Sequence, residues 1–121
     1  MRKIFLFATG LLLLPGAQAT AEPANGLTLM TALSGNTVVG SMDESGDYAE
    51  FFAPSGALYG TAAPASWYID GNRVCFRYHP GPYKRPDCVA AAIDGSSITW
   101  MDQGEPLGSG EILEGDPRGL Q

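Results

Sequence analysis

Residues 66–101 read SWYIDGNRVCFRYHPGPYKRPDCVAAAIDGSSITWM. Short hydrophobic runs alternate here with the turn sequences that begin at Asp70-Gly71 and Asp94-Gly95. Glycine adopts the positive φ of a tight turn without Cβ strain, and aspartate tolerates it. Between the turns, hydrophobic and polar side chains alternate with a period of two, which is typical of antiparallel strands. We therefore expect successive β-hairpins in this stretch.

The same stretch contains the two cysteines of the chain, Cys75 and Cys88. A hairpin that folds about residues 81–82 places them opposite each other. Cross-strand Cβ atoms lie about 4.5–5.5 Å apart, close to disulfide distance. Their spacing is not C-x-x-C and the chain has no further thiol, so a redox or metal site is disfavoured. We predict a structural disulfide.

Turn sequences recur along the rest of the chain at similar intervals. The chain has 16 glycines and 9 prolines but only 17% charged residues, which argues against a helical bundle. We predict an all-β protein, an antiparallel meander that curls into a small barrel or half-barrel. At most one short N-terminal helix is expected, over residues 27–33, where a strand is the alternative. The expected strands span residues 37–42, 48–52, 57–61, 66–69, 73–78, 88–93, 97–101 and 108–113.

The first residues have the features of a signal peptide. Arg2 and Lys3 precede an eleven-residue apolar run, too short to span a bilayer that needs about 20 residues. Ala17-Gln18-Ala19 then fits a signal peptidase site. We predict a signal peptide over residues 1–19, with cleavage after Ala21 or an uncleaved anchor as alternatives. A single domain follows over residues 20–121, with a mobile lead (20–26) and a mobile tail (115–121), and the protein is periplasmic or secreted.

Charge narrows the range of partners. Loss of Arg2 and Lys3 from seven basic residues leaves five against thirteen acidic ones, a net charge of −8. Nucleic acid is therefore excluded as a partner, and no stable membrane insertion is expected after cleavage. Four of the five remaining basic residues fall within residues 73–85. The expected partner is an envelope protein or an anionic ligand.

Several short patterns are similar to those of a family of small exported proteobacterial proteins of unknown function. They are Leu33-Ser34-Gly35-Asn36-Thr37, Phe52-Ala53-Pro54-x-Gly56, Trp67-x-x-x-Gly71-x-x-x-Cys75, Cys88 and Asp94-Gly95-x-x-Ile98. In that family a glycine is expected before the tryptophan, whereas Ala65-Ser66 stand here. The resemblance implies export and a compact β fold, and it supplies no catalytic residue.

No residue set in the sequence favours catalysis or metal binding. His79 is the single histidine, stands before a proline, and shows no orienting partner in the sequence. Asp43, Ser45, Asp47 and Glu50 carry oxygen ligands, but their spacing does not match a calcium loop. We predict no cofactor, no metal site and no enzymatic activity, and a small hydrolase is the least favoured alternative. Ser55-Gly56-Ala57-Leu58-Tyr59 resembles the Ser-Gly-x-x-Tyr loop of periplasmic lysozyme inhibitors, so an inhibitor of a lysozyme or protease is the other alternative.

The loop of residues 79–87 is the least ordinary segment. Its three prolines restrict the backbone, the predicted disulfide clamps its base, and aromatic and cationic side chains lie at its tip. We predict a non-catalytic exported binding domain that contacts its partner through this loop, although a barrel pocket would also serve. The expected partner-binding residues are Arg73, Arg77, His79, Tyr83, Lys84 and Arg85.

Overall fold

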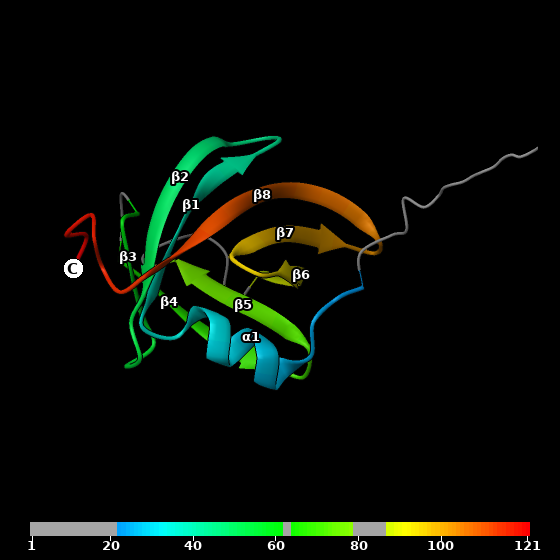
Figure 1. The fold of residues 1–121 in the computed structure, drawn as a ribbon, viewed down its shortest axis with the longest axis horizontal. Coiled ribbons are helices and arrows are strands. Elements are labelled where there is room, and N and C mark those ends of the chain that lie inside the picture. Colours follow the sequence, from blue (N-terminus) through cyan, green and yellow to red (C-terminus); the bar gives the residue numbers. More distant parts are fainter. Residues whose placement is uncertain (1–21, 62–63, 79–86) are drawn as a thin grey trace, which may run out of the picture.

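The computed structural model describes residues 22–61, 64–78 and 87–121, so the signal peptide predicted for residues 1–19 lies outside them. The described residues form one short helix and a closed antiparallel barrel, in which the strands follow one another in chain order and β8 pairs with β1 (Figure 1). The predicted all-β meander with one helix is confirmed. The elements are α1 Gly26–Leu33, β1 Asn36–Met42, β2 Gly46–Phe52, β3 Ala57–Tyr59, β4 Ala65–Asp70, β5 Arg73–Tyr78, β6 Asp87–Asp94, β7 Ser97–Asp102 and β8 Glu105–Glu114.

Seven of the eight strands differ in their bounds from the sequence prediction, and the differences at β3 and β8 have a physical reason. β3 ends at Tyr59 rather than at residue 61, because Gly60 has φ +105° and a Cβ there would lie 2.2 Å from the carbonyl oxygen of Ala49. β8 begins at Glu105 rather than at residue 108, because it pairs with both β7 and β1 to close the barrel. Its Pro106 stands where the β7–β8 register shifts, a position at which a missing N–H is tolerated.

The tight turns have the backbone that their glycines predict. Gly71, between β4 and β5, has φ +62°, and Gly95, between β6 and β7, has φ +61°. Because an L side chain rarely adopts this conformation, glycine in these turns also determines the register of the hairpins that follow. The register pairs Asp70 with Arg73 and Asp94 with Ser97.

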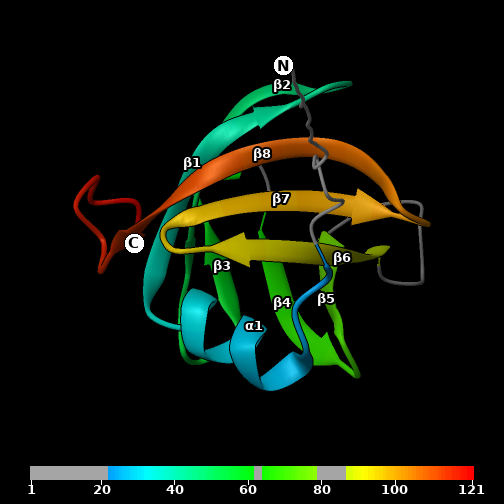
Figure 2. The ribbon, with the colours of Figure 1, turned by 45° about the vertical axis from the view of Figure 1, so that its right-hand side comes forward.

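Helix α1 covers one end of the barrel, beside the β4–β5 turn (Figures 1 and 2). The side chain of Asn25 caps it by accepting a hydrogen bond from the Thr28 N–H (2.9 Å), and the Gly26 N–H donates to the side chain of Asn72 in that turn (2.8 Å). Leu29 and Leu33 are fully buried against the barrel. Within the described residues, no helix is long and apolar enough to cross a membrane.

The barrel interior is filled mainly by aromatic and branched side chains. Phe52 lies at its centre, with its ring centroid 5.3 Å from Trp67, 6.0 Å from Phe76 and 6.5 Å from Trp100. Alternation along the strands is confirmed, since Val74 and Val89 are cross-strand partners on the inner face. The fully buried core members include Leu29, Leu33, Val38, Phe52 and Val74.

The start and the end of the barrel meet at the Gly35-Asn36-Thr37 pattern, which was singled out in the sequence, and at Gly115-Asp116, which follows β8. The side chain of Asn36 donates to the carbonyl of Ala32 (2.8 Å) and accepts from the N–H of Gly115 (3.0 Å). The buried Thr37 hydroxyl donates to the Gly115 carbonyl (2.7 Å). These bonds connect the end of α1, the start of β1 and the end of β8, which gives a physical reason for the Gly35-Asn36-Thr37 and Gly115-Asp116 patterns.

Candidate functional site

A cavity of about 220 Å³ lies inside the barrel at the end opposite α1. Eight-stranded barrels have interiors that are either filled by side chains or hold one small ligand; this barrel is filled over part of its length and leaves a cavity in the rest. The filled half is the Phe52 layer, and the cavity lies beyond it. Its lining comes from five strands and the β1–β2 turn: Met42, Ser45, Tyr48, Glu50, Phe76, Tyr78, Asp87, Val89 and Trp100.

Aromatic side chains form much of the cavity wall. The rings of Phe76 and Trp100 meet edge to face with centroids 5.8 Å apart, and the ring of Tyr78 stacks on Phe76 at 6.4 Å. Tyr78 is 46% exposed, so it lies at the mouth, while Trp100 is buried deeper in the wall. Such rings are large, rigid and weakly hydrated, which suits them to line a binding site.

Tyr48 is held in place by two hydrogen bonds. Nε1 of Trp100 donates to the Tyr48 hydroxyl (2.8 Å), which in turn donates to the carbonyl of Ser109 on β8 (3.1 Å). A Cβ on Gly110 would lie 2.6 Å from the Tyr48 hydroxyl oxygen, so glycine at this position leaves room for the ring to reach β8. Burial raises the pKa of Tyr48 despite the Trp100 hydrogen bond, and the nearby Glu50 charge raises it further.

Glu50 places a carboxyl group on the inner face of the barrel. It pairs in register with Val38, whose side chain is fully buried in the core, and cross-strand partners point to the same face of a sheet. Burial raises the pKa of Glu50 from 4.5 to about 7. None of the lining residues in the described part of the chain is a lysine, arginine or histidine. The carboxyl group therefore loses part of its hydration without gaining a cationic partner from this lining.

The acidic residues of the cavity lining also affect the pKa of Tyr78. Burial raises the pKa of Tyr78 to about 12, and the charges of Glu50 and Asp87 add to the shift. Asp87 pairs in register with Phe76 and lines the same end of the cavity. Two carboxyl groups thus act on one phenol, and the charged side chains of the described lining are all acidic.

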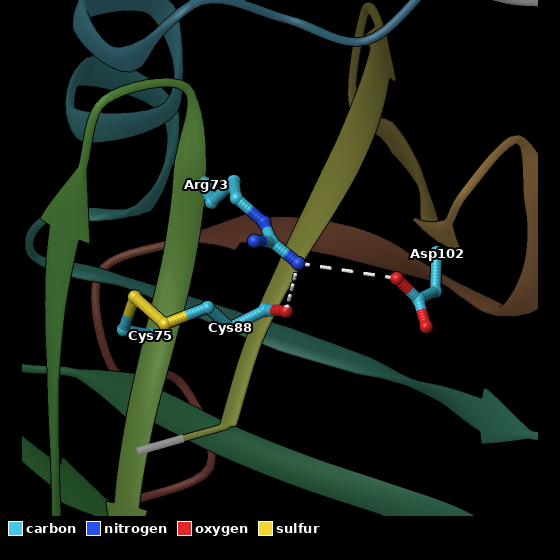
Figure 3. The surroundings of a disulfide bond; sticks show 4 residues. All are labelled: Arg73, Cys75, Cys88 and Asp102. Carbon is cyan, nitrogen blue, oxygen red and sulfur yellow. Dashed lines mark hydrogen bonds and ion pairs between the residues drawn. A yellow bond between two sulfur atoms is a disulfide. The ribbon is translucent and has the colours of Figure 1, made fainter. Parts of the chain in front are cut away.

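The described lining of the cavity contains none of the residues that the sequence predicted to bind a partner. His79, Tyr83, Lys84 and Arg85 fall outside the described residues. Arg73 lies on the outer surface, where its guanidinium donates to the Cys88 carbonyl (2.8 Å) and lies 3.9 Å from the carboxylate of Asp102 (Figure 3). Arg77 is half-buried and has an interaction of its own. Neither arginine lines the cavity.

The predicted disulfide is confirmed. Cys75 and Cys88 are directly opposite each other in the β5–β6 register and are covalently joined (Figure 3). Among the described residues that register has three pairs, and the pairs on either side of the disulfide include Phe76, Asp87 and Val89 of the cavity wall. The disulfide therefore closes the short seam beside the cavity.

The other residue patterns considered in the sequence do not form a common site in the described part of the chain. Within residues 22–61, 64–78 and 87–121 no three His, Cys, Asp or Glu side chains are grouped so that they could hold a metal ion. Asp43 and Asp47 are exposed at the β1–β2 hairpin, whereas Glu50 points into the barrel. Ser55 lies in the exposed β2–β3 turn, and its hydroxyl oxygen accepts a hydrogen bond from the Ala57 N–H (3.3 Å).

A second, broader depression lies on the outer surface over β1, β2 and β8, with a volume of about 760 Å³. It is wide open to solvent and lined largely by small side chains and backbone, including Gly40 and Gly110. Binding sites for small molecules are usually enclosed and lined by hydrophobic and aromatic groups with a few polar ones. The interior cavity fits that description and the outer depression does not.

No protein-family model, curated protein or solved structure matches this chain. The resemblance to small exported proteobacterial proteins thus stays a prediction, and the candidate site depends on its own geometry.

The sequence pattern presented Glu50 only as a potential calcium ligand, and it gave Tyr48 no role in binding. A usable signal was present in the period of two along Tyr48-Ala49-Glu50-Phe51-Phe52, which places Tyr48, Glu50 and Phe52 on one face. A carboxyl group on a hydrophobic face is uncommon enough to mark a site.

Proposed function

We propose that this protein is an exported, non-catalytic binding domain that holds one small molecule in the open end of its barrel. The observation that carries the proposal is the interior cavity, with aromatic walls and a half-buried carboxyl group. Its volume of about 220 Å³ equals that of roughly seven water molecules at about 30 Å³ each. A ligand of about seven to ten non-hydrogen atoms fits this space, smaller than the drug-sized ligands of typical pockets.

The wall of the cavity is preorganised, which supports a role in binding. Tyr48 is fixed by two hydrogen bonds, and the β5–β6 wall is fixed by the disulfide. A site that is already ordered loses little conformational entropy when a ligand arrives. The rigid wall therefore favours affinity even for a ligand with few atoms.

The cavity supports the proposal better than the cationic hairpin does. Arg73 is engaged with the Cys88 carbonyl and with Asp102, and four of the other predicted contact residues lie outside the described part of the chain. The cavity, in contrast, is lined by nine residues of the described part of the chain.

Export is part of the same proposal. It is supported by the signal-peptide pattern of residues 1–19 and by the disulfide, since disulfides persist in oxidising compartments. The intact mass of the protein from a periplasmic or culture fraction tests it. We expect a chain that begins at Thr20 or Glu22 and lacks free thiols after denaturation; a chain that keeps residues 1–19 would contradict it.

Ligand binding is tested with a set of small cationic, neutral and anionic molecules of seven to ten non-hydrogen atoms, the size that the cavity allows. Methyl resonances of Met42 and Val89 and the fluorescence of Trp100 report on the cavity wall. We expect at least one molecule of the set to shift these signals in a saturable way.

A variant that fills the cavity tests where the ligand binds. Val89→Phe adds a larger side chain to the cavity lining, so it should abolish or strongly reduce binding. Val39→Phe is the matched control, because Val39 is half-buried on the outer side of β1. If no molecule of the set shifts the signals, or if Val89→Phe binds as well as the wild type does, the cavity is not a ligand site.

A further inference from the structure

We infer that the ligand of this cavity is a small organic cation, an ammonium group with an apolar body, held between Glu50 and the aromatic wall. The inference rests on the proposed function, because it names the chemical class that the same cavity selects. Three properties of the cavity support it independently, namely its charge, the nature of its walls and its size.

Charge is the first property. Glu50 and Asp87 are the ionisable acids that line the cavity, and the described lining contains no basic side chain. An anionic ligand would meet two like charges in a partly desolvated space, which disfavours it. A neutral ligand would displace water from the Glu50 carboxylate without giving it a partner, which also disfavours binding. A cation would give the carboxylate a partner that the described lining does not supply.

The walls are the second property. Tyr48, Phe76, Tyr78 and Trp100 surround the space next to Glu50. The faces of aromatic rings carry negative charge and attract cations that lie within about 6 Å of the ring centroid, tryptophan most strongly. A quaternary ammonium is weakly hydrated, whereas a primary ammonium can donate hydrogen bonds to the Glu50 carboxylate, and the methyl or methylene groups of either pack on the rings.

Size and donor number exclude a bare metal ion. Ca²⁺ takes six to eight oxygen ligands, whereas the described part of the chain has no group of three acidic, His or Cys side chains that could hold a metal. The volume of about 220 Å³ is also larger than one ion needs and matches a molecule with an apolar body.

The titration of Glu50 should make cation binding at this site depend on pH. Burial raises its pKa to about 7, so a fraction of about one tenth is ionised at pH 6 and about nine tenths at pH 8. The other titratable groups that face it are Tyr48 and Tyr78, whose pKa values are raised, and Asp87 at the mouth. Because the phenols keep their protons over this range, binding of a cation of constant charge should strengthen about tenfold from pH 6 to pH 8.

Probe molecules of nearly the same shape and different charge test directly whether the ligand is a cation. Choline, 3,3-dimethylbutan-1-ol and 3,3-dimethylbutanoate have nearly the same shape and differ in charge, as do benzylammonium, benzyl alcohol and benzoate. Affinities are measured at pH 8 from the methyl shifts of Met42 and Val89, in sodium phosphate or borate, because amine buffers would compete. We expect the cation of at least one series to bind tenfold or more tightly than its neutral and anionic partners.

The Glu50→Gln variant tests the role of the carboxylate. It keeps the size of the side chain and removes the charge, so affinity for the cation should fall roughly 10- to 100-fold, the range for a hydrogen bond to a charged group, and the pH dependence should disappear. Glu44→Gln is the control, because Glu44 is exposed in the β1–β2 turn and does not line the cavity. It should leave affinity unchanged.

The outcomes separate this inference from the proposed function. If a neutral or anionic probe binds in the cavity as well as its cation does, or if Glu50→Gln keeps the affinity for the cation, the cation inference is overturned and the proposed function stands. If no probe of any charge binds and the broader set of small molecules also fails, both are overturned.

Discussion

Replacement of Glu50 by glutamine should change how the stability of the protein depends on pH, even without a ligand. The folded barrel holds this carboxyl group between Tyr48, Tyr78 and the aromatic wall, where burial disfavours its charged form. The unfolded chain exposes it to water. Glutamine has the same shape and no charge at any pH, so the variant removes only this difference between the two states.

The sign follows from the direction of the shift. The pKa of Glu50 rises from 4.5 to about 7 on folding, so between these values the folded protein keeps a proton that the unfolded chain has released. The free energy of unfolding of the wild type therefore falls as pH rises through this window and is constant above it. At 1.36 kcal/mol per pH unit, the interval from 4.5 to 7 amounts to at most about 3 kcal/mol.

Urea denaturation of the wild type and of Glu50→Gln at pH 5, 6, 7 and 8 measures the difference. We expect the two proteins to agree within about 1 kcal/mol at pH 5, and the variant to be more stable by up to about 3 kcal/mol at pH 8. The exposed Glu44→Gln variant should follow the wild type at every pH. A difference between Glu50→Gln and wild type that does not change with pH, or a wild type that becomes the more stable protein toward pH 8, would refute the reasoning, because it would mean that the carboxylate has a stabilising partner.

The remaining predictions concern the free energy of unfolding measured in urea. Tyr48→Phe removes two hydrogen bonds and leaves the buried tryptophan N–H without its acceptor, so it should cost about 1–3 kcal/mol; a loss no larger than that of Tyr68→Phe, at a residue that is 38% exposed, would argue against it. Joint replacement of Cys75 and Cys88 by serine opens a loop with a sequence separation of 13 and should cost about 3 kcal/mol, as should a reducing agent on the wild type; equal stability with and without reductant would contradict this. Leu29→Ala should cost about 2–5 kcal/mol, because Leu29 is fully buried between α1 and the barrel; a loss below 1 kcal/mol would show that α1 contributes little to the core.

The two ends of the barrel have different roles. At the α1 end, Leu29 and Leu33 fill the interior and Asn36 connects α1 to the end of β8, so this end supplies stability. At the other end the interior is left open and contains Glu50, whose burial is unfavourable to folding at neutral pH. Residues that lower stability in this way are commonly retained for function.

Much of the fold could be predicted from local features of the sequence. The Asp-Gly turns determined where hairpins form, because only a few residues tolerate positive φ, and Gly71 and Gly95 adopt it. The spacing of Cys75 and Cys88 about a turn predicted their pairing, because hairpin register follows from chain geometry. Alternation predicted which residues share a face, since the side chains of a strand point to opposite faces in turn.

The candidate site depended on contacts that local sequence does not encode. Closure of the barrel brings β8 beside β1, so that Tyr48 on β2 reaches across β1 to the Ser109 carbonyl on β8, where glycine at position 110 leaves room for the ring. A cavity is the space that side chains from five strands leave unfilled together, so no single strand predicts it. The pKa of Glu50 likewise depends on how much water the whole barrel excludes, and the outward Arg73 is occupied by Asp102 of a strand that is distant in sequence. Periodicity placed Glu50 on the inner face, but only the packing of the entire barrel decided that this face borders an empty space.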